Sequence, residues 1–153
     1  MKNIVKITAM LLILSMAAVM LVSCSTFGSI KSNFEKNGYE YVEIKDDASE
    51  DEAKQANTIV ASLEKGEISC TAHLFKTKTN VNASVIEIVV PSYAMVLEFK
   101  SDKELDEALA DNETIKGIIK DAQKSDVVNG NCLLIPLSVA KYDEMVKIFK
   151  GKE

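Results

Sequence analysis

The apolar residues of this chain recur at helical spacing directly after an uncharged N-terminal stretch. Phe27, Ile30 and Phe34 are three or four positions apart and would share one face of a helix. Gly38 stands where a helix commonly ends in a left-handed residue. The spacing therefore predicts a short helix over residues 29–37.

A strand and a second helix are predicted after this turn. Residues 39–44 are mostly aromatic and β-branched, as is typical of strands. The acidic run 46–52 contains Ser49 and Glu52 at the spacing of a capping box, and acidic residues in a first turn complement the helix dipole. The run lacks the glycine that an EF-hand loop needs at its sixth position, so a calcium loop is the less favoured interpretation. We expect the helix to end near Gly66.

Alternating residues predict three strands in the middle of the chain. They lie at residues 68–75, at residues 86–90 before a proline, and at residues 95–99. In the first strand one face collects the following apolar residues: Ile68, Cys70, Ala72 and Leu74. The other face is more polar and carries His73, which we expect to be exposed to solvent or partly packed.

The C-terminal third predicts a broken helix, a turn and a strand. Ser101 and Glu104 repeat the capping-box spacing, and Asp111-Asn112 interrupts the apolar positions that follow. Residues 129–131 form an Asn-Gly-Asn turn. The uninterrupted apolar run at residues 132–135 suits a central strand that is covered on both faces.

The chain ends in one more predicted helix, for which Ser138 is the expected N-cap. Its inward positions are Val139, Tyr142, Val146 and Phe149. The order after the first helix is therefore β-α-β-β-β-α-β-α. This order favours an α+β fold, with helices packed on a single mixed or antiparallel sheet in a broadly ferredoxin-like arrangement.

Length and charge narrow the class of protein. The chain has 153 residues, which is the size of one ordinary domain. It carries 18 Lys, no Arg and 23 acidic residues, for a net charge of −5. Nucleic-acid binding needs clustered positive charge on the phosphates, so an acidic chain without Arg is not expected to bind DNA or RNA.

The N-terminus combines a basic start with an uncharged stretch. Lys2 and Lys6 precede 16 residues without charge, from Ile7 to Val22. A helix of this length spans about 24 Å, less than the roughly 30 Å of a bilayer core. Such a stretch behind a basic start is typical of a secretory signal.

The four residues Leu21-Val22-Ser23-Cys24 complete this pattern. The N-terminus resembles that of bacterial lipoprotein precursors, whose lipobox places Leu and small or branched residues before an obligatory Cys. The resemblance implies cleavage between Ser23 and Cys24 and a diacylglyceryl group on the Cys24 sulfur. A plain secretory leader or a retained N-terminal helix is the alternative.

The resemblance also implies an organisation and a location. Residues 1–23 would be the signal peptide, 24–28 a short lipidated tether, and 29–153 a single α+β domain. The lipid would anchor the domain at the extracytoplasmic face of the cell membrane, or at the outer membrane if the host has two membranes. The mature chain would carry 16 Lys against 23 acidic residues, a net charge of −7. Anionic lipids would repel such a surface, so the lipid on Cys24 rather than the protein surface would attach the domain to the membrane.

Few residues of the domain point to catalysis or to a metal. His73 is the only histidine, whereas a zinc site needs three or four ligands, so no metal is expected. The chain has no G-x-S-x-G elbow, no phosphate-binding glycine loop and no C-x-x-C motif. No cofactor is therefore expected besides the lipid on Cys24.

The remaining cysteines leave two alternatives open. Cys70 and Cys132 both lie on apolar strands, where cysteine often packs as a small hydrophobic residue. Export would permit a disulfide between them. In a ferredoxin-like order their strands would lie at opposite edges of the sheet, so two free buried thiols are favoured over the disulfide.

These observations favour a non-catalytic binding module with an unidentified protein or envelope ligand as its partner. The alternative is a small envelope enzyme or enzyme inhibitor that uses scattered carboxylates and His73. A hydrogen bond from His73 to both a carboxylate and a hydroxyl would favour the enzyme. A wide exposed face without a pocket would favour binding.

Overall fold

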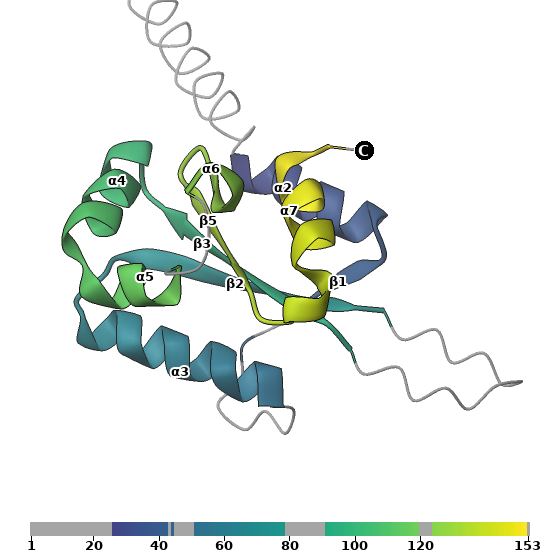
Figure 1. Ribbon diagram of the computed structural model, residues 1–153, viewed down its shortest axis with the longest axis horizontal. Coiled ribbons are helices and arrows are strands. Elements are labelled where there is room, and N and C mark those ends of the chain that lie inside the picture. The colour runs from purple at the N-terminus through teal and green to yellow at the C-terminus, as the bar shows by residue number, and fades with distance from the viewer. Residues whose placement is uncertain (1–25, 43, 45–50, 79–90, 120–123, 153) are drawn as a thin grey trace, which may run out of the picture.

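Five strands form one antiparallel sheet in the order β1-β2-β3-β5-β4 (Figure 1). The computed structural model describes residues 26–42, 44, 51–78, 91–119 and 124–152. The strands of the sheet are β1 (Tyr39–Val42), β2 (Cys70–Thr77), β3 (Tyr93–Phe99), β4 (Val128–Asn129) and β5 (Cys132–Pro136). The expected α+β class with one antiparallel sheet is thereby confirmed.

Helices cover both faces of this sheet. One face carries α2 (Thr26–Lys36) and α7 (Tyr142–Lys150), the latter preceded by the 3-10 turn η1 (Val139–Lys141) (Figure 1). The other face carries α3 (Asp51–Lys65), α4 (Asp102–Asp111) and α5 (Glu113–Ile118). A short helix, α6 (Lys124–Val127), leads into β4. The ferredoxin-like arrangement is not confirmed, because the sheet lies between two helical layers.

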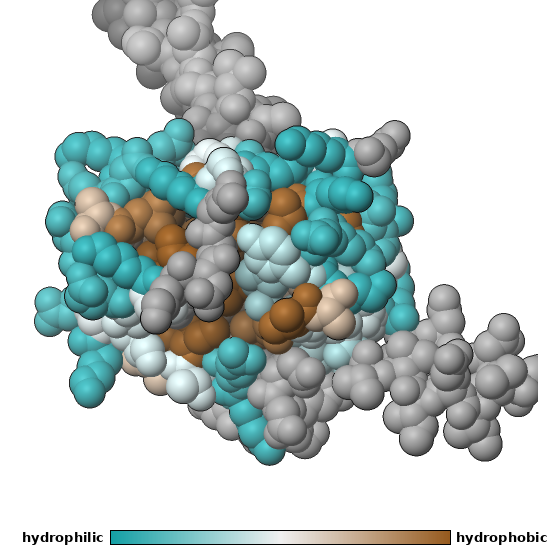
Figure 2. All heavy atoms as spheres, viewed as in Figure 1, coloured by the Kyte–Doolittle hydropathy of each residue, from teal (hydrophilic) through white to brown (hydrophobic). Residues whose placement is uncertain are grey.

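The strand register divides the buried side chains between the two faces. Leu74 lies opposite Met95, while the next pair, His73 and Val96, points to the other side of the sheet. Every residue of β3 except Glu98 is buried, because β3 lies in the middle of the sheet, between the two helical layers. Figure 2 shows hydrophobic atoms gathered between the helices and hydrophilic residues around them.

Three of the predicted local signals are confirmed. The Ser101 hydroxyl accepts the Glu104 N–H at 3.2 Å and caps α4. Asn112 ends α4 and caps α5 with its side chain, so the predicted interruption is a second cap. Gly38, two residues after the end of α2, has a φ of +82°.

Two positions at the end of the chain differ from the prediction. The Ser138 hydroxyl makes no capping bond but accepts the Tyr93 N–H at 3.0 Å, because the strand end lies within its reach. Val139 is 87% exposed and therefore does not line the core. Phe149 is buried as predicted, Met145 and Ile148 are the other buried positions of α7, and Tyr142 and Val146 are half-buried.

The first helix starts earlier than predicted. It begins at Thr26, so residues 26–28 of the expected tether are helical. Phe27 packs on the sheet, which places this first turn in the folded domain. The predicted leader with Leu21, Ser23 and Cys24 lies outside the described residues. Ser49 and the predicted strand at residues 86–90 lie outside them as well.

Candidate functional site

The polar pattern of its strand had suggested that His73 is exposed to solvent or partly packed. In the structure His73 is buried. Only 8% of its surface is exposed. The face of β2 that carries His73 and Phe75 lies under α2, whose Phe34 stacks on Phe75 at 4.6 Å between ring centroids. The alternation of polar and apolar residues therefore marked two covered faces, not one covered and one solvated face.

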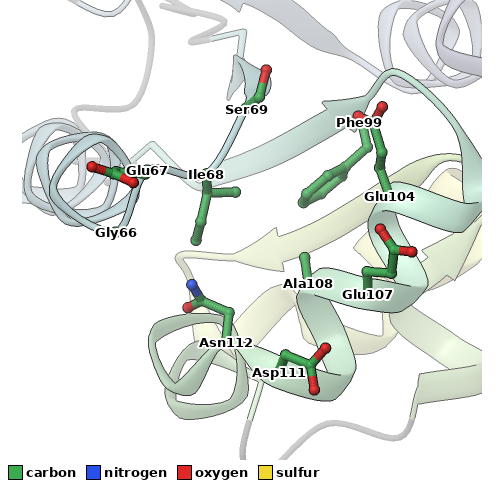
Figure 3. A pocket seen from close by; sticks show the side chains of 10 residues that line it. All are labelled: Gly66, Glu67, Ile68, Ser69, Phe99, Glu104, Glu107, Ala108, Asp111 and Asn112. Carbon is green, nitrogen blue, oxygen red and sulfur yellow. The ribbon is translucent and has the colours of Figure 1, made fainter.

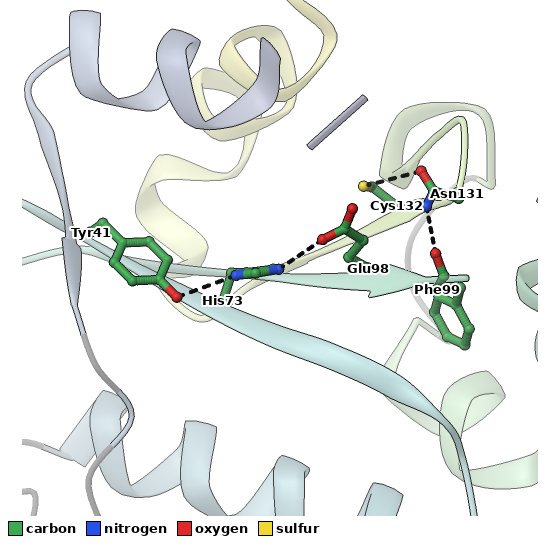
Figure 4. A network of polar contacts seen from close by, with 6 residues as sticks. All are labelled: Tyr41, His73, Glu98, Phe99, Asn131 and Cys132. Carbon is green, nitrogen blue, oxygen red and sulfur yellow. Dashed lines mark hydrogen bonds and ion pairs between the residues drawn. The ribbon is translucent and has the colours of Figure 1, made fainter. Parts of the chain in front are cut away.

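Three strands contribute to a chain of hydrogen bonds through this histidine, which we call the His73 network. The Tyr41 hydroxyl of β1 lies 3.3 Å from Nδ1, and Oε2 of Glu98 on β3 lies 3.1 Å from Nε2 (Figure 4). A carboxylate can only accept, so Nε2 carries the hydrogen and Nδ1 accepts from the Tyr41 hydroxyl. Both ring nitrogens of His73 are thus engaged within the protein.

The surroundings favour the neutral form of this ring. Burial lowers the pKa of His73 below its ordinary value of 6.5, and the nearby Lys31 lowers it further against the opposing effect of Glu98. The Phe27 ring of α2 stacks on the imidazole with 3.6 Å between centroids. Lys31 itself lies over the Tyr41 ring at 4.9 Å. Helix α2 therefore covers the His73 network through Phe27 and Lys31.

Glu98 connects the network to a surface cavity of about 370 Å³, which we call the Glu98 cavity. The cavity is lined by residues 69–71, residues 98–100 and Asn131. The Glu98 side chain is 25% exposed, and Oε1 makes no hydrogen bond with any residue that the structure describes. Because the bond to His73 fixes Oε2, Oε1 is held in one position, where it can accept a hydrogen bond from a ligand.

The first turn of α2 lies beside this cavity. A Cβ placed on Gly130 would lie 2.7 Å from Oγ1 of Thr26, so the turn between β4 and β5 touches the first residue of the helix. The next residue of that turn, Asn131, lines the cavity. Phe27 stacks on His73, which bonds to Glu98. The start of α2 is therefore held next to the cavity from two sides.

Asn131 completes the cavity wall and is bonded to the buried Cys132. The Asn131 amide donates to the Phe99 carbonyl and accepts from the Cys132 thiol at 3.7 Å (Figure 4). Burial, helped by the negative charge of Glu98 and Asp102, raises the pKa of Cys132 to about 12. This thiol is a buried structural group and not a nucleophile.

Cys70 and Cys132 are both free thiols. Their partners in β3 are Phe99 and Glu98, which are consecutive residues and point to opposite faces of the sheet. A ferredoxin-like order would place their strands at opposite edges of the sheet. In the structure the two strands instead flank β3. The sheet itself separates the two sulfur atoms.

A second hollow of about 380 Å³ lies between the end of α3 and α4. Ile68, Phe99 and Ala108 point into it, and the carboxylates of Glu107 and Asp111 stand along α4 (Figure 3). Figure 3 also shows Asn112, whose side chain is already used as the cap of α5. We call this feature the acidic hollow.

We also searched the described part of the chain for a metal site and for a membrane-spanning helix. In that part, no group of three or more His, Cys, Asp or Glu side chains is placed to hold a metal ion. None of its helices is long and apolar enough to cross a membrane. Comparison with protein-family models, with curated proteins and with solved structures finds no match for this chain.

The sequence pointed to only part of this site. His73 was a candidate, but its partners Tyr41 and Glu98 were not, because they come from strands far away along the chain. One signal was available: Glu98 is the single charged residue among the seven residues of β3. A carboxylate inside such an apolar strand needs a partner, and the only histidine lies on the neighbouring strand.

Proposed function

We propose that this chain is a non-catalytic binding protein of the bacterial cell envelope. A diacylglyceryl group on Cys24 would hold it at the extracytoplasmic face of the membrane. The observation that carries this proposal is the sequence Leu21-Val22-Ser23-Cys24 behind a basic start and an uncharged stretch. One acyl chain binds a membrane reversibly, whereas the two of a diacylglyceryl group give a stable anchor.

The position of α2 supports a close attachment. Only Ser25 stands between Cys24 and the first residue of this helix, and two residues of extended chain span about 7 Å. The helix is packed on the sheet through Phe27, Ile30 and Phe34. A lipid on Cys24 would therefore hold the side of the domain around Thr26 at the membrane surface.

The Glu98 cavity is the binding site that the geometry favours. It is open to solvent and contains a carboxylate oriented by a buried histidine. It also contains Lys100, a cationic group without an ion pair among the described residues. Convergent polar groups held by rigid elements are typical of ligand sites.

The alternative proposal is a small envelope enzyme that uses the His73 network. The hydrogen bonds of His73 to a hydroxyl and to a carboxylate favour it. Against it, both nitrogens of His73 are engaged and the ring is buried under Phe27, so only Tyr41 and Glu98 could meet a substrate. Replacing Tyr41 with Phe separates the proposals. A binding function in the Glu98 cavity would persist, whereas proton transfer through the network would be lost.

The anchor is tested by metabolic labelling with palmitate in a bacterial host. The wild-type chain is expected to incorporate the label, and Cys24→Ala is expected to lose it entirely. Cys70→Ala is the matched control, because this half-buried cysteine is far along the chain from the leader and should leave the label unchanged. Label that persists in Cys24→Ala would refute lipidation at this residue.

A further inference from the structure

The Glu98 cavity carries two opposite charges and lies beside the start of α2, two residues after the proposed lipid attachment at Cys24. Glu98 offers a free carboxylate oxygen that His73 holds in place. Lys100 follows two residues later, directly after the end of β3, and also lines the cavity. A ligand with a positive and a negative group on a short spacer would match this pair.

The remaining cavity wall supplies hydrogen bonds without further charge. Thr71 lies opposite Glu98 in the register of β2 and β3, and its hydroxyl can donate or accept. The Asn131 side chain is fixed by its bonds to the Phe99 carbonyl and the Cys132 thiol. Asn131 is therefore preorganised, so a ligand would not need to order this side chain on binding.

The membrane surface is the source of ligand that this position favours. Thr26 touches the turn next to Asn131, and Cys24 precedes Thr26 by two residues. A lipid anchor at that distance would keep the cavity at the level of the phospholipid head groups, where their local concentration is high. The negative balance of the mature chain disfavours purely anionic lipids.

We propose that the Glu98 cavity binds the phosphoethanolamine head group of a membrane phospholipid. The ammonium group would donate to Glu98, and the phosphate would pair with Lys100 near the Thr71 hydroxyl. A choline head group has no N–H to donate, and a glycerol head group has no positive charge. The inference rests on the proposed membrane anchoring for the source of the ligand, but not for the chemistry of the cavity.

The cavity is tested first with soluble head groups. The full-length Cys24→Ala chain, which carries no lipid, is purified in detergent and titrated with glycerophosphoethanolamine by NMR. We expect saturable binding about tenfold tighter than that of glycerophosphocholine or glycerophosphoglycerol. Equal binding of the three compounds, or no binding, would overturn the proposal.

Matched variants locate the two charges. Glu98→Gln and Lys100→Gln are each expected to weaken binding about tenfold. Glu107→Gln in the acidic hollow and Lys103→Gln on α4 remove the same charges elsewhere and should leave binding unchanged. Lys100 is exposed, so its variant keeps the test valid even if Glu98→Gln does not fold. Unchanged binding in Lys100→Gln would contradict the proposed pairing.

The source of the ligand is tested with the lipidated wild-type chain in vesicles. In phosphatidylglycerol vesicles the protein should retain radiolabelled glycerophosphoethanolamine. Adding phosphatidylethanolamine to the bilayer should abolish this retention, because the lipid then occupies the cavity. Retention in both vesicles would show that the cavity takes a soluble compound and would overturn the lipid source. Palmitate labelling separately reports whether the anchoring proposal itself has failed.

Discussion

Side chains from three elements lie around His73, and two of them fix its tautomer by hydrogen bonds. Tyr41 of β1 donates to Nδ1, Glu98 of β3 accepts from Nε2, and Lys31 of α2 opposes a positive charge on the ring. Burial is the largest of the effects on its pKa and favours the neutral form. A buried polar side chain is tolerated here because its hydrogen-bonding groups are satisfied.

We predict that acid destabilises the fold through His73. Its pKa is lowered in the fold, so below the unfolded-state value of 6.5 the unfolded chain binds the proton first. The stability contributed by neutral His73 is complete above that value and is lost as the pH falls below it. His73→Gln removes this titration.

The measurement is thermal unfolding of both proteins by circular dichroism between about pH 7.5 and pH 5. The Tm advantage of the wild-type chain over His73→Gln should shrink as the pH falls. Both proteins share the carboxylates that do not contact His73, so the comparison cancels the acid titration of those groups. An advantage that stays constant over this range would contradict the prediction.

At the scale of elements, α2 is fixed to the domain by the first two residues of its first turn. Phe27 stacks on His73, and Thr26 packs against the turn between β4 and β5 at Gly130. Gly130 has a φ of +54° and no side chain, which lets the helix approach the turn. The turn glycine thereby positions the helix that covers the His73 network.

We predict that Gly130→Ala costs about 2 kcal/mol of unfolding free energy, measured by urea denaturation. The new Cβ is strained by φ and would meet Thr26 Oγ1 at 2.7 Å. Gly38→Ala is the matched control. With a φ of +82° and no atom within 4 Å of the new Cβ, it should cost only about 1 kcal/mol. Adding Thr26→Ala to Gly130→Ala should recover part of the loss. Equal losses in the two glycine variants would rule out the contact.

At the scale of the whole molecule, the sheet acts as a partition between two helical layers. Cys70 faces the layer of α3 and α4, and Cys132 faces that of α2 and α7. Burial raises the pKa of Cys70 to about 11 and is the main reason that the pKa of Cys132 is about 12. Two thiols on opposite faces of one sheet cannot form a disulfide within the fold.

We therefore predict two unreactive thiols in the native Cys24→Ala chain, which has no other cysteine. At about pH 8 roughly one Cys70 thiol in a thousand would be ionised, so Ellman's reagent should react slowly. In denaturant two thiols should react at once. Fewer than two thiols under those conditions would demonstrate a disulfide, and a fast native reaction would contradict the burial.

Much of the secondary structure was predictable because it depends on near neighbours. Ser101 caps a helix with a group three residues away, and Gly38 and Gly130 permit turns at their own φ. The burial of the polar face of β2 was not predictable. It depends on Phe27 and Phe34, which approach from a helix about forty residues earlier in the chain.

The sequence by itself determined the periodicity of the strands and helices, the α+β class and the cap at Ser101. Its leader pattern is also the whole basis for the proposed lipid anchor at Cys24. Tertiary structure alone decided that helices cover both faces of the sheet and that Tyr41, His73 and Glu98 meet. The physical reason is range. Periodicity and capping act between residues a few positions apart, whereas strand pairing brings together side chains that the chain separates by tens of residues.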